Sequence, residues 1–138
     1  MFIKGGFMAQ EKLIKKINDF ILDLGIAAKS VGDGMWVIHD EFENIDNIVV
    51  SIEEPIVIFR VKLMSVPNKN KEQFYEKLLK MNASSLVHGA YAIENGSVVI
   101  VDTLQSENLD LNEFQASIES LTLAIAQDYK ELSQFINK

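Results

Sequence analysis

Few side chains in this sequence belong to the types that catalyse reactions or bind metals. There are two histidines, His39 and His88, and no cysteine, which excludes disulfides, thiolate metal sites and cysteine nucleophiles. The histidines fall in different predicted loops without carboxylates at ligand spacing, so no metal site is predicted. Ser84, Ser85 and His88 are nucleophile and base types, but no nucleophile-elbow glycines, oxyanion loop or orienting acid accompany them. We therefore expect no catalytic residue and no enzyme activity.

An acidic run raises the question of calcium binding. It contains Asp40, Glu41, Glu43 and Asp46. The run lacks the alternating ligand spacing and central glycine of an EF-hand loop, so we interpret it as a solvated loop. The glycines form neither a phosphate-binding loop nor a dinucleotide fingerprint. No cofactor is predicted.

The elements that would position a site begin with one helix and three strands. Apolar residues recur every three or four positions over residues 10–24, a pattern typical of an amphipathic helix, and Gly25 is expected to end it. A short strand is predicted within residues 31–38 and a loop over residues 39–47. Two further strands, residues 48–52 and 56–64, are separated by a segment that contains Pro55, which belongs at such a connection.

The strand at residues 56–64 carries the candidate binding surface. Strand alternation predicts a core face with Val57, Phe59, Val61 and Leu63. The opposite face is half apolar and half basic, with Ile56, Ile58, Arg60, Lys62 and Met64. We predict that this face contacts a segment of a partner protein; the alternative is that it belongs to the monomer core or to a dimer seam, where it would contact a second copy of the chain. Arg60, the single arginine, suits a carboxylate clamp, although an intramolecular or solvated pairing is the favoured interpretation.

The second half of the chain predicts a helix, a hairpin and a long final helix. The second helix is expected to begin near Asn70, with Gln73 completing a capping box. Asn95-Gly96, between AYAIE and SVVIVD, is typical of a two-residue type I′ hairpin turn. Asp110 and Glu113 have capping-box spacing, and an apolar stripe follows them as far as residue 136. The order α-β-β-β-α-β-β-α favours an α+β fold with helices packed on a mainly antiparallel sheet.

Length, composition and charge favour one domain with a protein partner. A chain of 138 residues with 48% hydrophobic residues can bury a core of its own. We expect residues 10–138 to form this domain and residues 1–9 to be a flexible N-terminal extension, with Met8 as an alternative start to Met1. No apolar run approaches the ~20 residues of a membrane span, and no signal-peptide pattern is present, so we expect a cytoplasmic protein. The net charge of −7 argues against nucleic acid as a partner.

The segment LLKMNASSLVHGAYAIENGSVVIVDTL resembles YbjN-type domains. The element order over residues 10–136 is similar to that of type III secretion chaperones of the CesT-like class. The matching residues are Leu78, Leu79, Asn82, His88, Gly89, Ala90, Gly96 and Leu104. This resemblance implies a small, acidic, cytoplasmic homodimer. It also implies binding of a protein or peptide client, as secretion chaperones wrap an extended effector segment over hydrophobic patches, while YbjN-type proteins are linked to stress response and regulation.

Three functions stay open at this point. The first is a non-enzymatic, homodimeric protein-binding module, which predicts an exposed apolar face or a symmetric interface. The second is a small-molecule-sensing regulatory domain, whose pocket between sheet and helices would have Trp36 or Tyr91 as an aromatic wall. The third, ranked last, is an enzyme in which His88 lies within hydrogen-bond reach of a carboxylate.

Overall fold

The computed structural model describes residues 2–40, 45–86 and 88–136. The elements in chain order are α1 (Phe2–Leu24), β1 (Ala27–Gly32), β2 (Met35–Asp40), β3 (Ile45–Glu53), β4 (Ile56–Ser65), α2 (Lys71–Ser84), β5 (Ala90–Glu94), β6 (Ser97–Gln105), α3 (Leu111–Leu132) and the short 3₁₀ helix η1 (Ser133–Phe135). This arrangement confirms the predicted α+β class and the mainly antiparallel sheet. It also contains one strand, β1, that the sequence pattern did not indicate.

The six strands form one sheet in the order β1-β2-β3-β4-β6-β5, and every neighbouring pair is antiparallel. Strands β1 and β5 are therefore the two edges. The sequence of β1, AAKSVG, has mostly exposed side chains and no alternation of polar and apolar residues, so periodicity could not reveal it. Its pairing with β2, in which Lys29 lies opposite Val37, makes it a strand.

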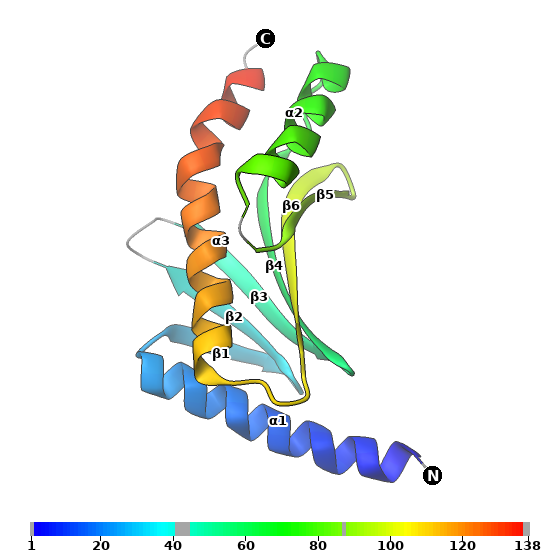
Figure 1. The fold of residues 1–138 in the computed structure, drawn as a ribbon, viewed down its shortest axis with the longest axis vertical. Coiled ribbons are helices and arrows are strands. Elements are labelled where there is room, and N and C mark those ends of the chain that lie inside the picture. The colour runs from blue at the N-terminus through cyan, green and yellow to red at the C-terminus, as the bar shows by residue number, and fades with distance from the viewer. Residues whose placement is uncertain (1, 41–44, 87, 137–138) are drawn as a thin grey trace.

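All three helices contribute to a single core on one face of the sheet. In Figure 1, α3 crosses in front of the strands beside α2, and α1 lies across one end of the sheet. Phe114 of α3 links the layers, because its ring contacts Phe20 of α1 and Phe59 of β4, with centroid separations of 5.5 and 5.4 Å. The buried residues of α2, Phe74, Leu78 and Met81, join the same core. None of these helices covers the opposite face of the sheet within the described residues.

The helix ends agree with only part of the sequence pattern. Gly25 has φ +66°, the left-handed conformation of a helix C-terminal stop, as predicted. The carboxylate of Asp110 accepts a hydrogen bond of 2.8 Å from the Glu113 amide, which confirms the cap of α3. The predicted capping box of α2 is wrong, since Asn70 is left-handed and its side chain makes no cap hydrogen bond. The chain leaves the α3 helix at Leu132 and continues as η1, earlier than the apolar stripe indicated.

The first helix begins earlier than the apolar pattern predicts. Helical backbone extends from Phe2, whereas the periodic apolar residues begin near position 10. Two consecutive glycines, Gly5 and Gly6, lie in this first part of α1, and each costs about 1 kcal/mol relative to alanine in a helix. The division into a flexible extension and a domain of residues 10–138 stays a prediction.

A register shift in β4 corrects one member of the predicted surface. Lys62 lies opposite Val99 of β6, but the next paired residue, Met64, lies opposite Val98. Because one extra residue reverses the alternation of side chains, Met64 turns into the core, where it is only 7% exposed. Val57, Phe59 and Val61 are buried as predicted. Met64 therefore does not belong to the surface with Ile56, Ile58, Arg60 and Lys62.

Candidate functional site

The helix-free face of the sheet gathers β-branched and basic side chains from four strands. Register places Val37 of β2, Val49 of β3, Arg60 of β4 and Val101 of β6 in one row across it. Residues directly opposite one another in antiparallel strands point to the same side, so this row and its alternate neighbours make one surface. We call it the open face and define it by Val37, Val49, Ile56, Ile58, Arg60, Lys62, Val99 and Val101.

An ion pair crosses the open face. Arg60 Nε lies 2.9 Å from Glu94 Oε1, and both side chains are 40% exposed. Arg60 is opposite Val101 on β6, and Glu94 is opposite Ser97 on the same strand, so the pair spans β6 at the position of Val99. Val99 lies between Lys62 of β4 and Ala92 of β5 in the register of the sheet and is only 5% exposed. The intramolecular pairing of Arg60 agrees with the favoured interpretation of its sequence.

The residues considered for catalysis do not converge. His88 is exposed, and no salt bridge joins it to a carboxylate within the described parts of the chain. The hydroxyl of Ser84 donates a hydrogen bond of 3.0 Å to the Lys80 carbonyl of its own helix. Among the described residues, no group of three or more histidine, aspartate or glutamate side chains could hold a metal ion. Glu41 and Glu43 of the acidic run lie outside the described residues.

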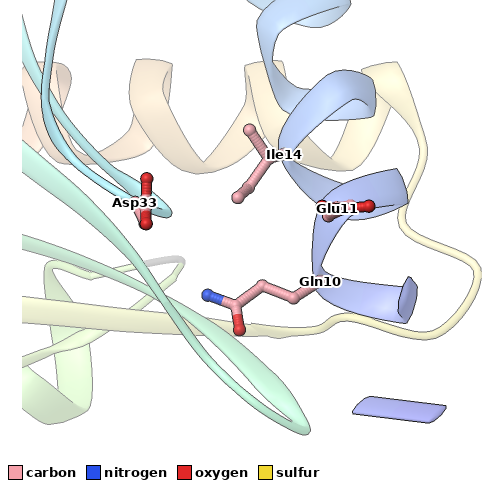
Figure 2. Close-up of a pocket in the computed structure, with 4 residues that line it drawn as sticks. All are labelled: Gln10, Glu11, Ile14 and Asp33. Carbon is pink, nitrogen blue, oxygen red and sulfur yellow. The ribbon is translucent and has the colours of Figure 1, made fainter. Parts of the chain in front are cut away.

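The aromatic residues proposed as pocket walls are part of the core. Trp36 is buried and donates its indole N–H to Asn18 Oδ1 at 2.9 Å, which ties β2 to α1. Tyr91 is also buried. A pocket of about 220 Å³ lies between α1 and the β1–β2 turn, lined by Gln10, Glu11, Ile14 and Asp33 (Figure 2). Neither aromatic residue lines it, so this pocket is not the one that the sensor hypothesis requires.

The segment that resembles YbjN-type domains fastens α2 to the edge strand β5. The Asn82 side chain accepts a hydrogen bond of 2.6 Å from the Tyr91 amide and donates one of 3.4 Å to the Tyr91 carbonyl. Gly89 is left-handed, with φ +81°, and a Cβ there would lie 2.8 Å from the Val101 carbonyl oxygen. These residues have structural roles. Asn82 also bonds to the outward N–H and C=O groups of Tyr91, with which a further strand would otherwise pair.

Exposed apolar side chains lie on α2 and β5, the two elements that the Asn82–Tyr91 hydrogen bonds join. Tyr75 and Leu79 are one turn apart on α2, and Leu79 is one turn before Asn82, the residue that contacts β5. Ile93 is exposed on β5, two residues beyond Tyr91. We call Tyr75, Leu79 and Ile93 the edge patch. Leu79 is 68% exposed, and with Tyr75 and Ile93 it adds to the apolar surface that remains in contact with water.

The sequence pattern did not predict two acidic residues of the site region. Asp128 is buried on α3 and accepts a hydrogen bond of 2.6 Å from the Tyr91 hydroxyl. Glu94 pairs with Arg60 across 34 positions of sequence. Both contacts join residues far apart in the chain, and no local spacing indicates either of them. The position of Asp128 within the apolar pattern of α3 was the one available signal.

Within the described residues, no helix has the length and apolar character needed to cross a membrane. The architecture is a six-stranded antiparallel sheet with three helices on one face and an apolar, partly basic face left open. Residues 10–138 match the model of the CesT_Tir_1 family. The chain belongs to this family.

Solved structures share the fold at low sequence identity. A chain of the heterodimeric ExoU–SpcU complex from the type III secretion system of Pseudomonas aeruginosa has a TM-score of 0.63 and 18% identity, over 88% of this chain and 95% of that chain. A chain of the ExsC–ExsE complex has a TM-score of 0.66 and 14% identity, over 89% and 94%. YbjN from E. coli has a TM-score of 0.63 and 12% identity, over 85% and 91%. No curated protein sequence matches the chain.

Proposed function

We propose that this protein is a non-enzymatic, chaperone-like module that binds a segment of another protein on the open face. The observation that carries the proposal is a sheet face of valine and isoleucine side chains that no described helix covers. Val37, Val49, Ile58 and Val101 are each partly exposed, and contiguous apolar surface that stays in contact with water is costly and is typical of interaction sites. Family membership supports the proposal, as do fold relatives solved in chaperone–effector complexes, such as HopA1–SchA. A cytoplasmic location agrees with a chain that has no cysteine.

The open face is suited to an extended or amphipathic segment. Its row of Val37, Val49 and Val101 runs across the strands, and Ile58 lies next to this row on β4. A bound segment would bury these side chains and gain about 25 cal/mol for each Å² of apolar surface removed from water. Polar side chains on the face, including Lys62 and Thr103, would fix its orientation.

Replacing Ile58 by Asp is the direct test of the open face. The new carboxylate would be desolvated by a bound segment, so we expect affinity for the partner to fall at least about tenfold, or 1.4 kcal/mol. A photoreactive amino acid at position 58 first captures the partner in cells, and the same label at Leu123 on exposed α3 controls for random capture. The purified partner is then titrated against wild type, I58D and the matched variant L123D by calorimetry.

Three results separate the interpretations. Loss of binding in I58D alone, with unchanged circular dichroism and melting temperature, supports the proposal. Equal affinity of I58D and wild type for the captured partner contradicts it. If position 58 crosslinks only to a second copy of this chain, the open face is a dimer seam and the client-binding role is wrong.

We further propose that the protein is a homodimer that associates through the edge patch. Tyr75, Leu79 and Ile93 present apolar area next to an edge strand whose outward groups at Tyr91 are already bonded to Asn82. Association is therefore expected through side chains of α2 and β5, in an isologous contact typical of symmetric dimers. The open face would then stay available to a client.

Replacing Leu79 by Asp should weaken the dimer. A buried, unpaired carboxylate at the interface is expected to raise the dimer dissociation constant at least about tenfold. Light scattering across a dilution series gives the molar mass of wild type and L79D. Leu22 on α1 is another highly exposed leucine, and L22D, the matched control, should remain dimeric. A wild-type protein that is monomeric at every concentration contradicts the homodimer, and a dimeric L79D contradicts the edge patch as its interface.

A further inference from the structure

The guanidinium of Arg60 is only partly used inside the protein. It has five N–H donors, and among the described residues its one hydrogen bond runs from Nε to Glu94 Oε1. The donors of both Nη atoms have no partner there. The hydrogen bond to Glu94 thus fixes the orientation of the guanidinium through Nε. The two Nη atoms form a planar pair of donors that matches the two oxygens of a carboxylate.

The surroundings of Arg60 favour an anionic group over a neutral one. Lys62 lies two positions further along the same face of β4, and no salt bridge joins it to another described residue. The chain as a whole carries a net charge of −7. An acidic group of a partner is therefore repelled by most of this protein and attracted to this position, which gives a bound segment a defined register.

The apolar neighbours strengthen such a contact. Arg60 is half-buried, and Ile58, Val99 and Val101 lie around it in the register of the sheet. A segment that covers these side chains would exclude water from the guanidinium and strengthen its attraction to a carboxylate. The same segment must supply apolar side chains for the neighbours and an acid for Arg60.

We propose that the segment bound on the open face carries an aspartate or glutamate flanked by apolar residues, and that its carboxylate docks on the Nη atoms of Arg60. The inference rests on the proposed function and adds the chemistry of the partner to it. Glu94 acts as a positioning residue that orients the guanidinium. Arg60 binds the carboxylate of the partner segment.

A library of random linear peptides displayed on phage provides a probe of defined chemistry. Selection on purified wild-type protein, with counter-selection on I58D, isolates peptides that depend on the open face. We expect these peptides to be enriched in an acid between apolar residues. In synthetic versions, changing that acid to its amide should weaken binding to wild type about tenfold and leave binding to R60Q unchanged, because the partner of the acid is gone.

Matched variants isolate the role of the guanidinium. K16Q removes the same charge from an exposed position on α1 and should bind the acidic peptides like wild type. R60K keeps the charge but loses the planar fork, so its affinity should fall between those of wild type and R60Q. E94Q keeps Arg60 intact, and its amide oxygen can still accept the Nε hydrogen bond and orient the guanidinium. Binding of the acidic peptides should therefore persist in E94Q, which tests the site in a second variant if R60Q folds poorly.

The possible failures are distinguishable. Peptides that depend on Ile58 but show no acid preference, or that lose the same affinity on amidation with R60Q as with wild type, overturn the role of Arg60 and leave the proposed function standing. Failure to select any peptide that depends on Ile58, or conversion of a dimer to a monomer by I58D, overturns the proposed function and this inference together.

Discussion

Replacing Gly89 by alanine is expected to lower the free energy of unfolding by about 3 kcal/mol. Two costs add at this position. Gly89 has φ +81°, a conformation that disfavours any residue with a Cβ. The added Cβ would also lie 2.8 Å from the Val101 carbonyl oxygen and 3.3 Å from Asp102 Cβ, where the backbone of β6 would have to move. Denaturant unfolding followed by circular dichroism measures the loss.

Gly96 offers a matched control for this substitution. It has φ +76° in the β5–β6 turn, but a Cβ there would meet nothing within 4 Å. G96A therefore retains only the conformational cost, about 1 kcal/mol. The difference between the two variants measures the close approach of the Gly89 segment to β6. Equal losses for G89A and G96A would show that this approach has no energetic importance.

Replacing Tyr91 by phenylalanine should destabilise the protein by about 2 kcal/mol. The change removes the 2.6 Å hydrogen bond to Asp128 and leaves a buried carboxylate without that donor. Exposed Tyr129 is the control, and Y129F should change stability by less than about 0.5 kcal/mol. In the double variant Y91F/D128L the unpaired carboxylate is gone, so its loss should be smaller than the sum of the single losses. Additive losses would contradict a direct interaction.

The same pair predicts a dependence of stability on alkaline pH. Burial raises the pKa of Tyr91 above its ordinary value, and the hydrogen bond to Asp128 and the charge of that residue raise it further. The folded protein therefore holds the phenolic proton more tightly than the unfolded chain. Below about pH 10 both states keep the proton, and the contribution of Tyr91 to stability is fully present.

Above about pH 10 the unfolded chain ionises first, so stability should fall with rising pH by up to about 1.4 kcal/mol per unit from this one group. Urea unfolding of wild type and Y91F at about pH 8 and at about pH 11, on either side of the ordinary tyrosine pKa, measures this contribution. The free energy of unfolding should decline more steeply in wild type. Parallel declines would exclude Tyr91 as the source.

Local patterns in the sequence predicted the elements whose structure depends on neighbours in the chain. The stop at Gly25 and the Asp110 cap are formed by a few consecutive residues. The same is true of the Asn95-Gly96 turn, in which both residues have positive φ, as a type I′ turn requires. The core face of β4 follows from strict alternation as far as Val61. The YbjN-like segment indicated the fold, and its Asn82 and Gly89 make contacts between α2, β5 and β6 in this structure.

Tertiary structure alone decided the features that depend on distant residues. Strand β1 exists through its pairing with β2, the register shift in β4 turns Met64 into the core, and α2 packs on the same side of the sheet as α3. The open face results from the packing of α2 on the same side as α3. The sequence of an amphipathic helix does not indicate which side of a sheet the helix will cover. Likewise, Arg60 meets Glu94 only because β4 and β5 lie on either side of β6. The sequence by itself determined the face of β4 on which Ile58 and Arg60 lie, and only the packing of the helices left that face without a covering helix.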